Sequence, residues 1–236
     1  MSHGYSRYSH QPAYGGSEHP GPAYSPAPRK MSRTPQRQSR GGFGTGVRIA
    51  IGYVVVLWVV FFVQQTGALN LSWFGIHPRD TSTLWHVLTW SFLHANMDHL
   101  IGNTVTGALF AFLVGVTGKR TFWEVTIIAA ITGGLAAWFL GYPGTNHIGA
   151  SGVIYGWLSY LIVRGVFNRS LRQIILGVVL AFTYSGFVWG VIPTEAAVSW
   201  QGHLGGALGG IVAGAVITSD DPVRKISSRP QSPYGY

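Results

Sequence analysis

Six apolar segments, each close to twenty residues long, follow one another along this 236-residue chain. An α-helix rises about 1.5 Å per residue and the hydrocarbon core of a bilayer is about 30 Å thick, so about 20 apolar residues cross it once. Strands are too short for such runs, and we therefore expect an all-α, polytopic membrane protein with six transmembrane helices. The segments cover residues 48–67, 94–117, 121–141, 149–168, 171–190 and 200–218.

The composition agrees with a lipid environment. Only 10% of the residues are charged, whereas soluble domains carry about 25%. The 47% hydrophobic share excludes disorder throughout the chain. Because the chain has no cysteine, disulfide scaffolds, thiolate zinc sites and thiol nucleophiles are also excluded.

The ends of the chain differ from its middle. Residues 1–45 are rich in Ser, Gly, Pro, Tyr and Arg, contain Glu18 as their only acid and show no helical or strand period. We interpret them as a disordered cytoplasmic tail, too long and polar for the n-region of a signal peptide. Mitochondrial transit peptides are also rich in Arg and Ser. The many Pro and Gly residues here, however, disfavour the amphipathic helix that such a peptide forms. The expected membrane domain covers 46–219, and 220–236 form a short cytoplasmic C-terminal tail.

The positions of the basic residues predict the topology. A net charge of +9 and a pI near 10.1 would suit nucleic-acid binding, but the charges are not arranged as a binding patch. Seven precede or open the first segment, two lie between the second and third, three surround the turn after the fourth, and three follow the sixth. Only Arg79 falls on the opposite side. By the positive-inside rule both termini are cytoplasmic, and no nucleic-acid partner is expected.

With this topology, the second, fourth and sixth helices run inwards from the external side. Residues 68–93 form a long external loop. Four of its aromatic residues suit an interfacial belt: Trp73, Phe74, Trp85 and Trp90.

Polar residues near the starts of the three inward helices mark a candidate site. Polar groups inside a membrane helix are costly and are functional candidates by default. His99 and Asn103 are four residues apart and share one face of the second helix, Ser151 opens the fourth, and His203 lies near the start of the sixth. All four fall within the first turns of their helices, so we expect them at one depth and in one site.

This set of residues favours acyl transfer. A serine hydroxyl is a weak nucleophile and needs a base, which His203 can supply to Ser151. The oxyanion formed during hydrolysis needs hydrogen-bond donors, and the Asn103 amide, the His99 imidazole and the Ser151 backbone N–H can supply them. No buried acid accompanies the pair, so a Ser-His dyad is predicted rather than a triad.

The motifs together resemble those of the rhomboid family of intramembrane serine proteases, over residues 50–218. They are a helical His followed after four residues by Asn, a Gly-x-Ser-Gly with Tyr at serine plus four, and a His followed by Gly at plus three and plus seven. The resemblance implies a nucleophile at Ser151, a general base at His203 and an oxyanion-stabilising pair at His99 and Asn103. It also implies supporting roles for the following residues: His94, Gly149, Gly152, Tyr155, Gly206 and Gly210.

Two positions depart from the family pattern. Many rhomboids have Trp-Arg in the first external loop where this chain has Trp85-His86, and an acid after the second helix where it has Gly118. The resemblance also implies that helix 171–190 and loop 191–199 form a lateral gate for substrates.

The same residues allow other interpretations. Gly-x-Ser-Gly alone is better explained by close helix packing, and one His or Asn alone could equally be a contact between helices. The spacing of Gly202, Gly206 and Gly210 indicates such packing directly. His94, His99 and His203 could supply three metal ligands, but no His-Glu-x-x-His accompanies them. His147 precedes the fourth helix in a loop, and we do not expect it in the site.

Other classes of membrane protein fit less well. Glu124 is the only acid near a span interior, which excludes an aspartyl intramembrane protease. A small transporter would show inverted-repeat hydropathy, and none is present.

The predicted function is thus a serine endopeptidase that cleaves transmembrane proteins near the outer side of the membrane through an acyl-enzyme, without a cofactor or metal. The alternative is a non-catalytic rhomboid-like protein that binds or retains transmembrane clients. The partners expected for this chain are transmembrane protein substrates and the lipid bilayer. Six spans without an extra N-terminal helix favour the form found in bacterial plasma membranes.

Overall fold

The structure is a computed structural model that describes residues 41–194 and 198–217. In this part of the chain, six α-helices and four short 3₁₀ helices form the regular structure, and the one β-interaction is an isolated bridge between Ile76 and His147. The all-helical fold class is therefore confirmed. Most of the expected N-terminal tail and all of the C-terminal tail lie outside the described residues.

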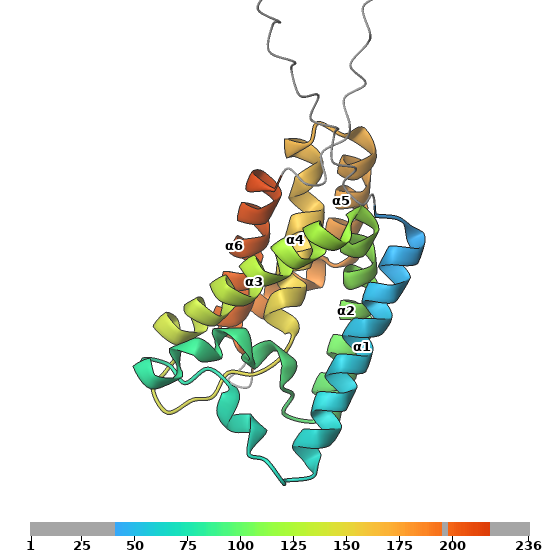
Figure 1. Cartoon of the computed structure of the whole chain (residues 1–236). Coiled ribbons are helices and arrows are strands. Elements are labelled where there is room, and N and C mark those ends of the chain that lie inside the picture. Colours follow the sequence, from blue (N-terminus) through green and yellow to red (C-terminus); the bar gives the residue numbers. More distant parts are fainter. Residues whose placement is uncertain (1–40, 195–197, 218–236) are drawn as a thin grey trace, which may run out of the picture. The chain divides into compact units, whose positions relative to one another are not determined.

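The helices follow the predicted order, and Figure 1 shows how they are arranged. The α-helices are α1 (Phe43–Gln65), α2 (Met97–Thr117), α3 (Lys119–Leu140), α4 (Ser151–Phe167), α5 (Leu171–Thr183) and α6 (Trp200–Val216). The 3₁₀ helices are η1 (Leu71–Phe74), η2 (Thr81–Leu88), η3 (Trp90–Phe92) and η4 (Ser185–Val191).

Helices α1, α2 and α3 are each long and apolar enough to cross a bilayer, and α5 with η4 passes the same test as one bent pair. Helix α4 is apolar but shorter, with 17 residues. Only 17% of the apolar window of α1 is buried, so most of its side chains face outwards. In water this exposure would be unfavourable, whereas in lipid it is the expected arrangement. The chain is a multi-pass membrane protein.

Two helix starts differ from the sequence prediction. Helix α1 begins at Phe43, inside the stretch 1–45 that we expected to be disordered, and the Phe43 ring packs edge-on against Phe112 at a centroid distance of 5.4 Å. Helix α2 begins at Met97 rather than at residue 94. Its N-cap is Asn96, whose side chain accepts a hydrogen bond from the backbone N–H of His99 at 2.9 Å.

The expectation of one continuous helix over 171–190 was wrong. Helix α5 ends at Thr183, and the chain turns by 65° into η4. The bend coincides with Ser185 and Gly186, a pair of residues that commonly accompanies sharp kinks. Two carbonyl oxygens of η4 accept hydrogen bonds from side chains of other helices, as described below, and these contacts hold the bent conformation.

Helix α4 is the central helix, because it packs against α2, α3, α5 and α6. Helix α6 lies so close to α4 that a Cβ atom on Gly206 would meet the carbonyl oxygen of Gly152, and one on Gly210 would meet that of Gly156. This is the close approach that the glycine spacing predicts. It fixes the start of α6 beside the start of α4.

The loop between α1 and α2 is tied to the helices by Trp90. We expected this residue in an interfacial belt, but its side chain is fully buried. The indole lies against Gly133, Gly152 and Gly202, and its Nε1–H donates to the carbonyl of Ala130 at 3.2 Å. The expectation for Trp90 was wrong because three helices leave glycine-lined space for a large ring, which spacing along the sequence does not reveal.

His86 anchors the same loop where many rhomboids carry Arg. Its side chain is fully buried between the rings of Trp73 and Trp85, with centroid distances of 4.6 and 4.4 Å. Its Nδ1 donates to the carbonyl of Gly75 at 2.7 Å. Aromatic contacts and this hydrogen bond thus hold His86 at the position where many rhomboids have Arg.

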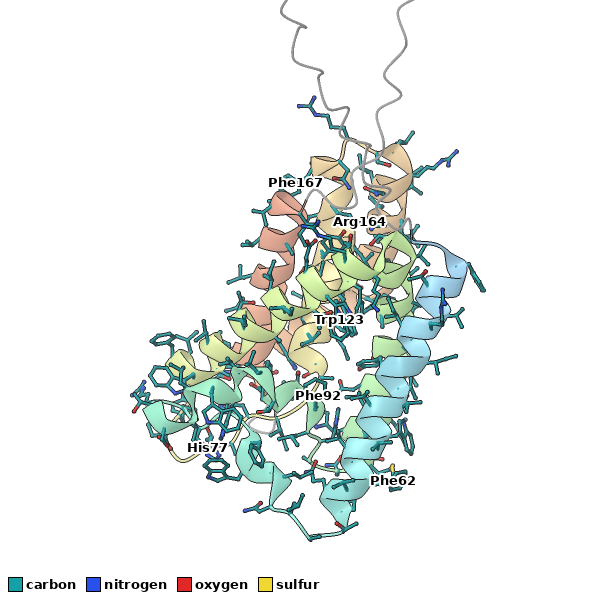
Figure 2. All side chains as sticks on the ribbon, viewed as in Figure 1. Phe62, His77, Phe92, Trp123, Arg164 and Phe167 are labelled. Atoms are coloured by element: carbon teal, nitrogen blue, oxygen red, sulfur yellow. The ribbon has the colours of Figure 1, made fainter. Side chains whose placement is uncertain are left out.

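One of the basic residues used to predict the topology is buried. Arg164 is buried in α4, with its guanidinium carbon 5.4 Å from the centroid of the Tyr160 ring (Figure 2). The topology that the basic residues predict therefore depends on the remaining positions.

Candidate active site

Ser151 and His203 are in direct contact. Ser151 is the first residue of α4, and its Oγ lies 2.7 Å from Nε2 of His203 in the first turn of α6. The other ring nitrogen, Nδ1, lies 2.8 Å from the carbonyl oxygen of Gly190. A carbonyl only accepts, so Nδ1 carries the proton and Nε2 presents its lone pair to the serine hydroxyl. This is the tautomer that a general base needs.

The His203 ring is held by Tyr155 and η4. The Tyr155 ring stacks on the imidazole with centroids 4.3 Å apart and an angle of 12° between the planes. The Tyr155 hydroxyl donates to the carbonyl of Phe187 at 2.8 Å. Carbonyls of η4 thus fix both the base and the ring that covers it, a role for residues 185–191 that the sequence did not indicate.

His99 and Asn103 open onto the same cavity as Ser151 and His203. Its volume is about 930 Å³, and much of its wall comes from loop 142–148 and from residues 193–194 and 198–200. The Asn103 side chain is buried, and among the described residues its Nδ2 has no hydrogen-bond acceptor. A buried donor without a partner is costly, which is a common feature of functional groups. The structure therefore brings together the four polar residues that the helix directions predict at one depth.

The glycines of the Gly-x-Ser-Gly motif are required by close contacts. Gly149 has a φ of 130°, and a Cβ atom there would lie 2.6 Å from the His99 ring and 3.6 Å from Oγ of Ser151. A Cβ atom on Gly152 would lie 2.5 Å from the Trp90 indole. Any side chain at Gly149 would therefore displace His99 and strain the backbone that carries Ser151.

His94 lies beside the site and not in the helix. Its fully buried ring packs edge-on against His99 at 5.1 Å. Gln64, near the end of α1, clamps its backbone: Nε2 donates to the His94 carbonyl at 2.9 Å, and Oε1 accepts from the His94 N–H at 3.3 Å. Gln64 is not among the residues predicted from the sequence, although a polar residue at the end of an apolar span was a usable signal.

A second His-Ser pair lies four residues before the first in each of the two segments. His147 Nδ1 is 2.7 Å from Oγ of Ser199, the N-cap of α6, whose Oγ accepts from the Gly202 N–H at 3.4 Å. Thr145 donates its hydroxyl proton to the Tyr142 carbonyl at 2.6 Å, so its oxygen accepts from His147 Nε2 at 3.0 Å. Nδ1 of neutral His147 is then the acceptor for the Ser199 hydroxyl.

Leaving His147 out of the site overlooked these contacts. Its backbone also pairs with Ile76, with both N–H to carbonyl distances at 2.9 Å, so this one residue joins the loop between α1 and α2 to the start of α6. Burial, helped by nearby His77, lowers the pKa of His147 below its ordinary value, which favours the neutral ring. The sequence signal was the shared separation of 52 residues in the two pairs.

In the described ranges, no three His, Cys, Asp or Glu side chains are grouped closely enough to hold a metal ion.

Comparison with known proteins identifies the family of this chain. Residues 81–220, more than half of the chain, match the Rhomboid domain. The chain belongs to the rhomboid family. An uncharacterised protein of Mycobacterium tuberculosis is 38% identical over 208 residues, which cover 85% of this chain and 86% of that protein. An uncharacterised protein of Mycobacterium leprae is 38% identical over 188 residues, covering 76% and 73%.

The rhomboid family includes proteases. The rhomboid protease GluP of Bacillus subtilis is 32% identical over 140 residues, which cover 56% of this chain and 26% of that protein. The predicted family membership of this rhomboid is thus confirmed. Its helical fold and apolar spans agree with the general activity of the family, intramembrane proteolysis.

Proposed function

We propose that this rhomboid is an active serine endopeptidase that cleaves transmembrane proteins near the outer side of the membrane. The observation that carries the proposal is the 2.7 Å contact between Ser151 Oγ and His203 Nε2, with the Nδ1 proton held by Gly190. A non-catalytic relative that only retains clients would have no need for a base in this tautomer beside a serine at the opening of a large cavity.

The reaction begins with a proton transfer. His203 accepts the Ser151 hydroxyl proton as Oγ attacks the scissile carbonyl, and the imidazolium keeps its hydrogen bond to Gly190. The stacked Tyr155 ring prevents the imidazole from turning away. His203 then gives the proton to the leaving amine, and water repeats the sequence on the acyl-enzyme.

The developing oxyanion needs fixed donors. The Asn103 Nδ2 has no acceptor within residues 41–194 and 198–217, so its N–H is available to bind negative charge without breaking a bond first. We assign it, with the His99 ring and the Ser151 backbone N–H, to the oxyanion site. His94, clamped by Gln64, supports the His99 ring from behind.

The substrate must present an unwound peptide. A transmembrane helix satisfies its own backbone hydrogen bonds, so it has to open locally before a carbonyl reaches Ser151. We therefore propose substrates with helix-breaking or small residues near their outer ends. The bend between α5 and η4 is the proposed side of substrate entry.

We assign the protein to the plasma membrane of a bacterium, with both termini cytoplasmic.

Cleavage in a bilayer tests this function. Purified full-length protein is reconstituted into liposomes with a fluorogenic transmembrane reporter, alongside Ser151→Ala and His203→Ala. We expect turnover by the wild type and a loss on the order of 10⁶-fold in kcat in each variant. Wild-type turnover by Ser151→Ala would overturn the assignment, and absence of turnover with a set of reporters that vary in helix stability would favour the client-binding alternative.

A further inference from the structure

A second cavity shares no lining residue with the cavity of the candidate active site. Its volume is about 600 Å³, and it is bounded by α1, α3, η3 and the start of α4. Helices α1 and α3 begin near each other and then diverge (Figure 1). Figure 2 shows Trp123 and Phe92, two of its lining residues, in the space between these helices. We call this cavity the α1–α3 groove.

The groove is apolar along most of its length. Its wall on α1 includes Ile49, Gly52, Tyr53, Val56 and Leu57, and its wall on α3 and α4 includes Phe122, Trp123, Val153 and Trp157. Val56 and Trp123 are 43% and 51% exposed, so the groove opens outwards. In a protein whose apolar helices span a membrane, that outer surface faces lipid.

The two ends of the groove differ in charge. At the end where α1 and α3 begin, Arg48 and Lys119 line it. Neither takes part in the ion pair found in the described part of the chain, which joins Arg120 to Glu124. The Nε–H of Arg48 donates a hydrogen bond to the carbonyl of Gly44 at 3.1 Å. No side chain caps the first turn of α3. Two cations and the positive end of a helix dipole therefore converge on one mouth.

The length of the groove beyond Arg48 matches one leaflet. From Arg48 to Leu57 it follows nine residues of α1, which at about 1.5 Å per residue is about 14 Å. Half of a hydrocarbon core of about 30 Å is nearly the same depth. A charged mouth above an apolar channel one leaflet deep is complementary to an anionic lipid with an extended acyl chain.

We propose that the α1–α3 groove binds an anionic phospholipid, with its phosphate between Arg48 and Lys119 and one acyl chain along α1. The deep end of the groove reaches Ala150, the residue before Ser151. Tyr53 in its wall donates its hydroxyl to the carbonyl of Asn103 at 2.9 Å. The acyl chain thus packs against the segments that carry the candidate active site.

The charged mouth is tested by lipid titration. The full chain is purified in detergent, and bound phosphatidylglycerol or phosphatidylcholine is counted by native mass spectrometry. We expect the wild type to prefer phosphatidylglycerol, and Arg48→Gln with Lys119→Gln to bind it about thirty-fold more weakly, since each basic residue near the membrane surface contributes about fivefold. The matched control, Arg169→Gln with Arg172→Gln, removes two cations at the turn after α4, outside the groove, and should retain the preference.

The apolar channel is tested by filling it. A Cβ atom on Gly52 meets nothing within 4 Å, so Gly52→Phe can occupy the groove without disturbing the backbone, whereas Gly102→Phe places the same ring at an equally open position on α2. We expect only Gly52→Phe to lose bound lipid, and glycerol 3-phosphate not to compete. Equal binding of the two lipids by the wild type, no effect of the charge variant, or no effect of Gly52→Phe would each overturn the proposal.

Discussion

His147 and Ser199 repeat, four residues earlier on each side, the hydrogen bond that joins Ser151 to His203. Both contacts measure 2.7 Å and both connect the approach to α4 with the start of α6, but the serine and histidine have exchanged sides. Because Ser199 also caps α6, this outer pair holds the helix start that carries His203. It is a positioning pair for the proposed dyad.

The neutral form of His147 predicts a pH-dependent stability. Its pKa is lowered in the folded protein by burial and by His77, so between that pKa and the ordinary value of about 6.5 the unfolded chain binds a proton that the folded chain does not. The free energy of unfolding should therefore fall as the pH falls below about 6.5. His147→Gln should flatten this dependence in thermal unfolding between pH 7.5 and 5. An unchanged slope would contradict the lowered pKa.

Gly190 is predicted to be essential for the position of His203. A Cβ atom there would collide with the Tyr155 hydroxyl and lie 3.1 Å from His203 Nδ1. Gly190→Ala should therefore lower kcat by about a hundredfold through misplacement of the base. Gly186→Ala changes the same short helix at a position where a Cβ atom meets nothing within 4 Å, so its kcat should stay near that of the wild type. Similar kcat values for the two variants would argue against the role of η4.

Asn103 should be unfavourable for stability and necessary for turnover. Replacing a buried, unpaired amide by an apolar group of similar size is near-neutral or stabilising, whereas loss of an oxyanion donor costs about 10²–10³ in kcat. Asn103→Leu is thus expected to unfold at the same temperature as the wild type or higher and to turn over far more slowly. A variant that is both less stable and fully active would show that Asn103 is a packing residue.

The absence of cysteine allows the predicted topology to be tested directly. Thr81→Cys lies in the loop before α2, and Ser170→Cys lies in the turn between α4 and α5. In intact cells, a membrane-impermeant maleimide should label the first variant and should reach the second only after permeabilisation. The reverse pattern would invert the orientation that the positive-inside rule predicts.

The sequence was sufficient for features that depend on length, spacing and helix direction. The apolar runs predicted six helices, and the places of His99, Asn103, Ser151 and His203 in the first turns of α2, α4 and α6 predicted that they lie together at one cavity. The small residues at Gly206 and Gly210 predicted the contact of α6 with α4, because a Cβ atom has a fixed position on a helix.

Features that depend on tertiary contacts could not be predicted in this way. Trp90 has the composition of a belt residue, and only the glycine-lined space between three helices makes it a core residue. The bend after Thr183 depends on side chains of α4 and α6 that bind η4 carbonyls. His147 gains its role only because the loop before α4 meets the cap of α6, 52 residues away.

Site-specific labelling tests the central claim most directly, since it asks which serine is activated and by which base. Full-length protein in liposomes is treated with a fluorophosphonate, and the modified residue is identified by peptide mass spectrometry in the wild type, His203→Ala and Ser199→Ala. We predict modification of Ser151 in the wild type and in Ser199→Ala, and none in His203→Ala. Modification of Ser199, or labelling of Ser151 at the wild-type rate without His203, would contradict the proposed dyad.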